Sequence, residues 1–299
     1  MPDRSFAYKS LKIFAFILLA GQSHAEVKVM DSLGHEVVVQ GLPKRVVSLV
    51  PHGTELFCMA GGCDRLVAVS ANSDAPESVK KLPHIGPYNA ISLEGILSFN
   101  PDLVLAWPSA NPTDVLAQLK RLGVPVYETD PETIEQIAGE LRAMAKLSGS
   151  QQGDLEAAKF LDGWAKLENM YARRRPVPVF LHIWDNPLMT LNDQSAVSSV
   201  LKVCGGYNIF GDVSVRVPQI SVEEVVARQP VLIVEGDHRQ RKESGELVKY
   251  WQPFNTIPAV KNRDIYSING DYLLRATPNL LKGANELCGL IDQARKRMK

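Results

Sequence analysis

The sequence lacks an excess of charge of either sign. It has 33 Lys and Arg residues against 33 Asp and Glu residues, which gives a formal net charge of zero at pH 7. A protein that binds nucleic acid needs a basic surface to pair with phosphates. The charge balance therefore argues against a nucleic-acid partner.

Common catalytic motifs are also missing. The sequence contains no Gly-x-Ser-x-Gly nucleophile elbow, no His-Glu-x-x-His zinc motif and no phosphate-binding loop. Carboxylates are numerous, but their spacing singles out no catalytic pair. We therefore expect that the protein is not an enzyme.

Long hydrophobic runs are scarce as well. The longest near the start covers residues 13–20, far short of the ~20 residues that a membrane-spanning helix needs. Arg4, Lys9 and Lys12 precede it, and Ser23-His24-Ala25 follow with small residues. This order is typical of a secretory signal peptide. We expect residues 1–25 to be cleaved, and no cysteine at the cut is available for a lipid anchor.

Cysteine is rare, with four residues at positions 58, 63, 204 and 288. Export to an oxidising compartment permits disulfides, and four cysteines allow three pairings. The spacing Cys58-x4-Cys63 could belong to a metal site, but no second close pair completes one. Disulfides or buried thiols are the favoured interpretation.

What the chain does have is the composition of a globular protein with a substantial core. Hydrophobic residues make up 45% of the sequence and charged residues 22%. A chain of 299 residues usually divides into two domains.

An internal repeat gives the domain organisation. Residues 91–107 read ISLEGILSFNPDLVLAW, and residues 220–236 read ISVEEVVARQPVLIVEG, so that identical residues recur 129 positions apart. Each copy predicts a helix that starts after a serine, a stop at proline and an unbroken apolar strand. Such strands are typical of parallel sheets that are buried on both faces. The same order arises by chance in α/β proteins, but the shared Ile-Ser-x-Glu opening favours duplication.

Strands and helices alternate around both copies, as α/β domains require. The pattern predicts a hairpin over 27–40, strands at 45–50, 66–70, 103–107 and 124–127, and a helix over 133–147. The second half shows strands at 177–184, 231–234 and 265–268 and a closing helix over 279–297.

A helical segment without a strand signal separates the two halves. Ala157, Leu161 and Trp164 recur at helical spacing between residues 154 and 174. A flexible linker would be rich in Gly, Ser or Pro, and this segment is not. We therefore expect an N-terminal lobe at 26–149, a stiff inter-lobe helix at 150–174 and a C-terminal lobe at 175–299.

Five motifs resemble the helical-backbone class of ABC solute-binding proteins, also called class III periplasmic binding proteins. They are RVVSLVPHGTEL (45–56), SLEGILSFNPDLVLAW (92–107), VCGGYNIF (203–210), SVEEVVARQP (221–230) and DYLLRATP (271–278). The third and fifth are most similar to the cobalamin-binding branch. The resemblance implies two three-layer αβα lobes joined by one long rigid helix. It also implies a monomer in the periplasm that delivers its ligand to an importer permease and ATPase.

Candidate ligand-binding residues follow the strands that should end at the seam between the lobes. His52, Tyr88, Trp107 and Trp184 lie in such loops, and aromatic walls suit the flat apolar face of a corrin ring. The resemblance places Tyr88, Trp107, Asp271 and Arg275 at ligand-contacting positions, and His52 in a pocket loop. Either tryptophan could instead belong to the core, and Arg275 could only brace its loop.

Three positions depart from the family pattern and leave the ligand open. Val217 and Ala75 stand where the family has aromatic residues, and Trp184 stands where a small residue is usual. We expect cobalamin or a related corrinoid, with haem or a ferric siderophore as the alternative. No cofactor is expected. A bare metal ion is disfavoured because His52, His84, His182 and His238 show no close ligand spacing. Axial ligation of haem or cobalt by His52 stays open.

The repeat also carries a matched pair of glutamates, Glu94 and Glu223. Each lies at the start of a predicted helix, where the helix dipole alone favours an acid by ~0.3–1 kcal/mol. The resemblance implies that both pair with arginines of the permease. It also implies a disulfide between Cys204 and Cys288, whereas Cys58 and Cys63 lie outside the family pattern and could form a short local bridge.

Overall fold

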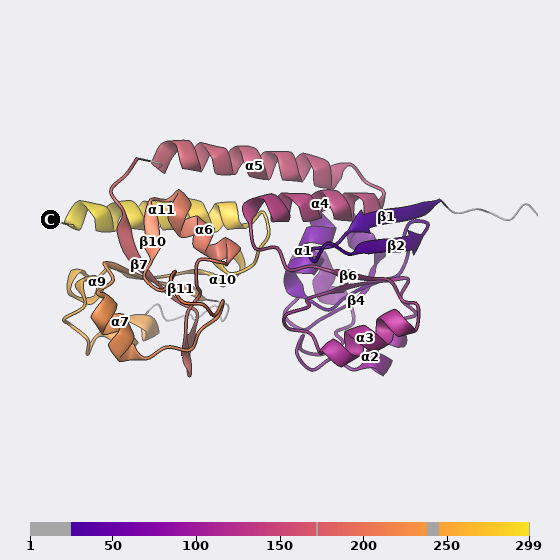
Figure 1. Ribbon diagram of the computed structural model, residues 1–299, viewed down its shortest axis with the longest axis horizontal. Coiled ribbons are helices and arrows are strands. Elements are labelled where there is room, and N and C mark those ends of the chain that lie inside the picture. Colours follow the sequence, from indigo (N-terminus) through magenta and orange to yellow (C-terminus); the bar gives the residue numbers. More distant parts are fainter. Residues whose placement is uncertain (1–24, 172, 238–244, 299) are drawn as a thin grey trace, which may run out of the picture.

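The computed structural model describes residues 25–171, 173–237 and 245–298. It has two α/β lobes, each with a parallel four-stranded sheet, and a long helix above them (Figure 1). The expected signal peptide lies outside the described residues, apart from Ala25. Among the described residues, no helix combines the length and the hydrophobicity that crossing a bilayer requires.

The N-terminal lobe is a three-layer αβα unit. Its sheet has the order β4-β3-β5-β6 and consists of β3 (Val46–Ser48), β4 (Leu66–Val69), β5 (Leu103–Ala106) and β6 (Val126–Glu128). Neighbouring residues of β5 point to opposite faces. Leu103 and Leu105 pack against the layer of α1 (Pro51–Met59) and α4 (Ile134–Ser148). Val104 and Ala106 pack against the layer of α2 (Leu93–Leu97) and α3 (Thr113–Arg121). The predicted hairpin is present as β1 (Glu26–Met30) and β2 (Glu36–Gln40).

The C-terminal lobe repeats this plan. Its sheet has the order β10-β7-β11-β12 and consists of β7 (Val177–His182), β10 (Gly206–Asn208), β11 (Leu232–Asp237) and β12 (Ile265–Asn269). One face is covered by α6 (Ala196–Val203) and α11 (Leu280–Arg297), with α10 (Gly270–Leu273) beside them. The other face is covered by α7 (Val222–Arg228), α8 (Glu246–Trp251) and α9 (Pro258–Asn262). The expectation of two three-layer lobes is confirmed.

Two details of this lobe differ from the sequence prediction. The predicted strand 177–184 ends at His182, and Trp184 instead opens a small hairpin of β8 (Trp184–Asp185) and β9 (Leu188–Met189). Strand β10 was not predicted, because it is three residues long and begins at the second of two consecutive glycines, which weaken the strand pattern.

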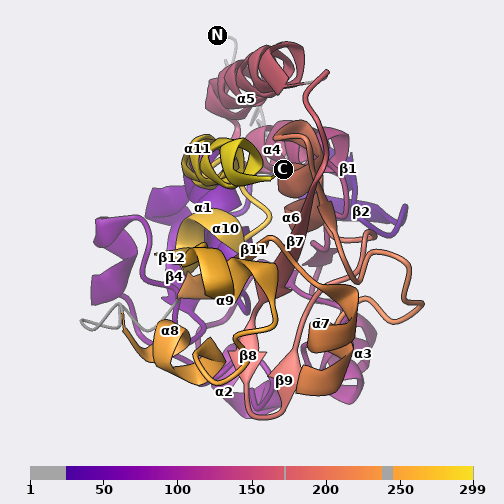
Figure 2. The same cartoon turned by 90° about the vertical axis from the view of Figure 1, so that its left-hand side faces the viewer.

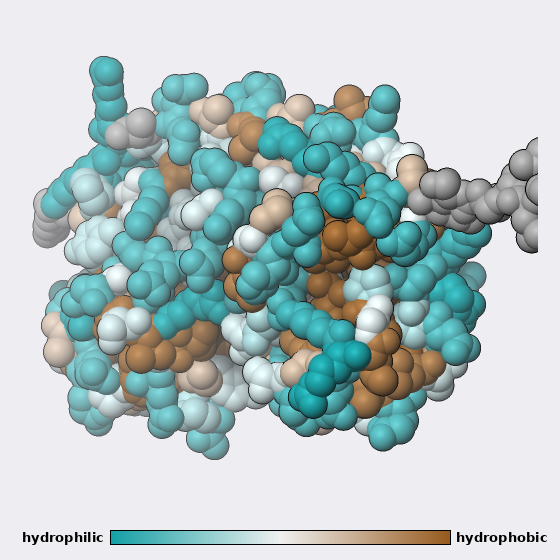
Figure 3. All heavy atoms as spheres, turned by 45° about the vertical axis from the view of Figure 1, so that its right-hand side comes forward, coloured by the Kyte–Doolittle hydropathy of each residue, from teal (hydrophilic) through white to brown (hydrophobic). Residues whose placement is uncertain are grey.

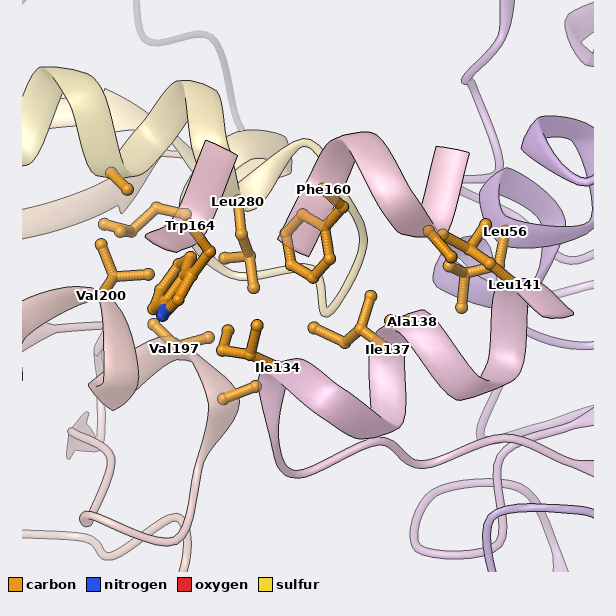
Figure 4. Packing of buried hydrophobic residues seen from close by; sticks show 14 of the residues in the cluster. Leu56, Ile134, Ile137, Ala138, Leu141, Phe160, Trp164, Val197, Val200 and Leu280 are labelled. Carbon is orange, nitrogen blue, oxygen red and sulfur yellow. The ribbon is translucent and has the colours of Figure 1, made fainter. Parts of the chain in front are cut away.

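The inter-lobe helix is α5 (Gln152–Tyr171), slightly shorter than the predicted 150–174. It packs over both lobes, and its buried side chains include Phe160 and Trp164. In Figure 4, Phe160 lies above Ile137, while Trp164 lies beside Val197 of the C-terminal lobe. Leu161, which we had placed on the packing face, is only half-buried. One continuous apolar core therefore joins α5 to both lobes and opposes large hinge motions.

All four cysteines form disulfides. Cys204 at the end of α6 pairs with Cys288 of α11, as the resemblance implied, and closes a loop of 84 residues. Cys58 of α1 pairs with Cys63, which settles the second pair as a local bridge. The long bridge contributes about 2–4 kcal/mol to stability.

One face of the molecule is mostly hydrophilic. The face in Figure 3 shows polar residues over most of its area, with hydrophobic residues in separate patches between them.

Candidate ligand site between the lobes

The loops that follow the strands of both sheets meet at the seam between the lobes (Figure 1). Seen from the C-terminal lobe, the β8–β9 hairpin lies at the end of the molecule away from α5 (Figure 2). Two sets of side-chain contacts cross this seam. Arg275, after β12, contacts Glu55 of α1, and Arg216, after β10, contacts Asp130, after β6. Loops at the carboxyl ends of parallel strands are the usual place for a ligand site in α/β proteins.

The N-terminal side of the seam carries an aromatic wall. The ring centroids of Tyr88 and Trp107 are 5.6 Å apart, and those of His52 and Trp107 are 5.2 Å apart with perpendicular ring planes. Asn111 fixes the wall, because its side chain accepts the Trp107 backbone N–H at 2.6 Å and donates to the Tyr88 carbonyl at 2.7 Å. Asp130 accepts the Trp107 indole N–H at 3.1 Å. Tyr88 and Trp107 are both half-buried, as a ligand-contacting wall requires.

His52 lies behind this wall and supports it. Its side chain is buried, and Nε2 donates a hydrogen bond to the Thr129 carbonyl at 3.2 Å. Burial lowers the pKa of His52 to about 4, so the ring is neutral at neutral pH. Nε2 carries the ring proton in this hydrogen bond, which argues against axial ligation through Nε2. Axial ligation by His52 otherwise stays a prediction.

On the C-terminal side of the seam, several apolar side chains are exposed. Trp184 is 49% exposed, and Val215 and Val217 are 59% and 40% exposed. Trp184 pairs with Met189 in the β8–β9 hairpin, and Met189 forms a β-bridge with Gln219. The hairpin and the loop 211–219 are thus adjacent segments of one surface. Exposed apolar side chains of this size commonly mark a binding surface.

Arg275 lies at the end of the seam beside β4 and β12. Its guanidinium donates to Glu55 Oε1 at 2.5 Å and to Asp74 Oδ1 at 3.1 Å, and it forms an ion pair with Asp271 at 2.9 Å. Glu55 also accepts from the Asn279 amide at 3.0 Å. The Arg275 side chain is only 9% exposed and that of Glu55 only 2%. Arg275 thus links the two lobes as a brace, a role not foreseen from the sequence, which had left open ligand contact or bracing of its own loop. Its contact with a ligand stays a prediction.

Four important residues were not found from the sequence: Glu55, Asn111, Asp130 and Arg216. Only Glu55 could have been singled out from the sequence. Apart from His52, it is the one ionisable side chain other than cysteine in the segment 46–60, where the other residues are apolar or small. A charged residue at a buried helix position must have a partner. Asp130 and Arg216 are 86 residues apart, and Asn111 bonds both Trp107, 4 residues away, and Tyr88, 23 residues away. No periodic pattern in the sequence marks these contacts.

Comparison with known proteins places the fold in a family. The family model described as "Periplasmic binding protein" matches residues 46–272. The chain belongs to this family.

Relatives within the family include named binding proteins. A vitamin B12-binding protein of Vibrio cholerae is 34% identical over 255 residues, which cover 85% of this chain and 91% of that protein. A vitamin B12-binding protein of Yersinia pestis is 40% identical over 247 residues, with coverages of 82% and 85%. The chain is therefore similar to these proteins over most of its length.

Solved structures of the family share the architecture. The periplasmic vitamin B12-binding protein BtuF of Vibrio cholerae matches with a TM-score of 0.78 at 34% identity, covering 86% of this chain and 99% of that one. The periplasmic heme-binding protein RhuT of Roseiflexus sp. RS-1 matches with a TM-score of 0.75 at 29% identity, with coverages of 84% and 99%. The two-lobe fold of class III periplasmic binding proteins is thus shared with members that bind different ligands.

Two of the histidines named as possible metal ligands, His84 and His182, lie in different surroundings. His84 is exposed, and His238 lies outside the described residues. His182 approaches Asp185 and Glu235, but the Trp251 indole N–H donates to its Nδ1 at 3.1 Å. The proton of a neutral His182 ring is therefore on Nε2, which faces Asp185 at 2.7 Å. That tautomer presents no lone pair from Nε2 to a metal ion.

The two repeat glutamates occupy equivalent exposed positions. Glu94 lies in the first turn of α2 and Glu223 in the first turn of α7, after the N-cap serines Ser92 and Ser221. Both helices lie on the side of the molecule opposite α5 (Figure 1). Within the described part of the chain, neither carboxylate forms a salt bridge. Two unpaired charges at a fixed separation, one on each lobe, suit docking to a surface with complementary charges.

Proposed function

We propose that this protein is the periplasmic binding component of an ABC importer for vitamin B12 or a related corrinoid. The observation that carries the proposal is the Tyr88–Trp107 wall at the inter-lobe seam, in a chain 40% identical to a vitamin B12-binding protein. A corrin ring offers a broad apolar face, and aromatic side chains bind such a face through area burial and stacking. Trp184 and Val217 supply apolar surface from the opposite lobe.

The cellular role follows from the same proposal. The signal peptide directs the chain to the periplasm, where it acts as a monomer and delivers its ligand to the permease and ATPase of the importer. Binding is passive, and the ATPase supplies the energy of transport.

A haem ligand is the second candidate. RhuT, at 29% identity, is a heme-binding protein. Tyr88 supports this alternative, because its half-buried phenol lies at the seam and a tyrosine oxygen can be an axial ligand of haem iron. The greater identity to the vitamin B12-binding proteins favours the corrinoid.

Replacing Trp107 with alanine tests the aromatic wall. We expect Trp107→Ala to weaken cyanocobalamin binding by about 10- to 100-fold, the loss typical of a buried aromatic anchor. Trp107→Phe should retain most of the affinity. Isothermal titration calorimetry on variants with unchanged circular dichroism gives the dissociation constants.

Tyr207→Ala is the matched control for this experiment. Tyr207 is 48% exposed and pairs with Pro178 near the amino end of β7. The seam lies at the carboxyl ends of the strands, so Tyr207 is remote from it. Its removal should leave the affinity unchanged. Equal affinities of Trp107→Ala and the wild type would reject the wall as the binding surface.

A further inference from the structure

Arg216 crosses the seam and binds three residues of the other lobe. Its Nη1 donates to Asp130 Oδ1 at 3.2 Å and to Glu132 Oε1 at 3.0 Å. Its Nη2 donates to Asp130 Oδ2 at 3.1 Å and to the Ser109 hydroxyl at 2.8 Å. The pairing with Asp130 is bidentate, the geometry in which arginine holds a carboxylate most firmly. All acceptors belong to the N-terminal lobe, so the guanidinium links the lobes directly.

Both sides of this contact are anchored in their own lobe. The Arg216 carbonyl accepts the Asn192 backbone N–H at 3.0 Å, and the Pro218 carbonyl accepts that of Thr190 at 3.2 Å. On the other side, the Asp130 backbone N–H donates to the Ser32 hydroxyl at 2.9 Å. Breaking the ion pair therefore separates two rigid surfaces and does not merely release two side chains.

The contact lies at one end of the seam, opposite the Arg275 brace. Asp130 follows β6 and Arg216 follows β10, which are the edge strands on that side of their sheets. Arg275 follows β12, the edge strand on the other side of the C-terminal sheet. Trp107 of the aromatic wall follows β5, which lies between the edge strands, so the wall lies between the two ends.

The two inter-lobe contacts differ in their exposure to solvent. The side chains of Arg216, Asp130 and Glu132 are 27%, 18% and 50% exposed, against 9% and 2% for Arg275 and Glu55. Salt screens a partly exposed pair far more strongly than a buried one. The Arg216 contact is thus the one that can open without leaving a buried charge unpaired.

The same carboxylate that holds Arg216 also holds the ligand wall. Asp130 accepts the Trp107 indole N–H and the Ser109 hydroxyl in addition to the guanidinium. When the Arg216 contact opens, Asp130 can keep its hydrogen bond to the Trp107 indole. The lobes can then separate beside the wall while the wall keeps its shape.

We propose that Arg216, Asp130 and Glu132 form an inter-lobe latch that must open before a ligand enters or leaves the seam. The statement about the ligand rests on the proposed function, whereas the statement about the lobes does not. Arg216 is accordingly a gating residue that acts on access to the wall and makes no contact with the ligand.

Lobe separation tests the latch without any ligand. Nitroxide labels on cysteines introduced at the exposed residues Asp114 of α3 and Ala227 of α7 report the inter-lobe distance by pulsed electron paramagnetic resonance. We expect Arg216→Gln to broaden the distance distribution and shift it to longer values. Glu132→Gln, which keeps an acceptor oxygen but removes one of the two carboxylate charges that face Arg216, should give an intermediate change.

Arg228→Gln is the matched control. Arg228 pairs with Asp212 at 2.7 Å and donates to the Ile209 carbonyl, and both partners belong to its own lobe. The substitution therefore removes the same charge beside the loop 211–219 without affecting a contact across the seam. Its distribution should equal that of the wild type. Identical distributions for Arg216→Gln, Arg228→Gln and the wild type would overturn the latch.

Ligand kinetics test the gating role. With cyanocobalamin in a stopped-flow instrument, Arg216→Gln should raise the association and dissociation rate constants by about tenfold each and leave their ratio nearly constant. High salt, about 0.5 M, should raise the association rate of the wild type but not that of the variant. Unchanged rates in a variant with separated lobes would reject gating. Failure of the wild type to bind would reject the proposed function and leave the distance measurement to decide the latch.

Discussion

Reversing both repeat glutamates, in the variant Glu94→Arg/Glu223→Arg, is expected to abolish ligand uptake by cells and to leave ligand affinity unchanged. Both carboxylates are exposed in the first turns of α2 and α7, away from the seam. Two positive charges in their place would repel the cationic permease surface that the proposed function requires. Like charges across an interface cost several kcal/mol and suppress association.

Uptake of labelled cobalamin into cells that express the matching permease measures the effect. Each single reversal should reduce uptake partially, because one correct charge per complex remains. Calorimetry on the purified double variant should give a dissociation constant within about twofold of the wild type, since ligand contacts are untouched.

A second double reversal controls for net charge and, through Glu135, for the helix dipole. Glu135 lies in the first turn of α4 and Glu286 lies on α11, both exposed and on the α5 side of the molecule. Glu135→Arg/Glu286→Arg changes the net charge equally and should transport normally. Normal transport by Glu94→Arg/Glu223→Arg would rule out the docking role.

Removing Arg275 is expected to cause the largest loss of stability among single substitutions at the seam. Arg275→Gln would leave Glu55, 2% exposed, with the neutral groups of Asn279 and Thr277 as its partners among the described residues. Breaking one half of a buried ion pair typically costs about 3–5 kcal/mol, because the remaining charge stays desolvated. Urea denaturation at pH 7, followed by tryptophan fluorescence, measures the loss.

The pH dependence of this loss identifies its cause. Burial already raises the pKa of Glu55, and Arg275 opposes the rise. Without Arg275 the folded-state pKa of Glu55 rises further above its unfolded value, so the folded variant binds an extra proton as the pH falls. The stability gap to the wild type should therefore be largest at neutral pH and should narrow toward pH 5.

The double variant Glu55→Gln/Arg275→Gln separates the two roles considered for Arg275. It removes both charges and should recover much of the stability that the single variant loses. A single variant with wild-type stability but greatly weakened cobalamin binding would show instead that Arg275 acts on the ligand and not as a brace.

The sequence predicted the helix and sheet layers of each lobe more completely than the contacts between the two lobes. Strands β5 and β11 were found because each is an unbroken apolar run after a proline, and α5 was found from the helical spacing of Ala157 and Trp164. These signals are local and need no knowledge of distant residues. Strand β10 was missed because it is too short to show a period.

The inter-lobe contacts could not be predicted in the same way. Arg216 and Asp130 are 86 residues apart, and Arg275 and Glu55 are 220 apart. Their pairing depends on how the two sheets face each other, which the hydrophobic pattern of one segment does not encode. Tyr88 and Trp107 could be predicted from the sequence. They lie in loops after strands, and such loops form the edge of a parallel sheet where ligands usually bind.

Calorimetric titration of the mature protein with cyanocobalamin, cobinamide, haemin and a ferric siderophore tests the central claim most directly. The aromatic seam predicts that cyanocobalamin binds one to one with a dissociation constant of roughly 1 μM or lower, and that cobinamide binds as well. Binding of haemin or the siderophore without binding of either corrinoid would contradict the account.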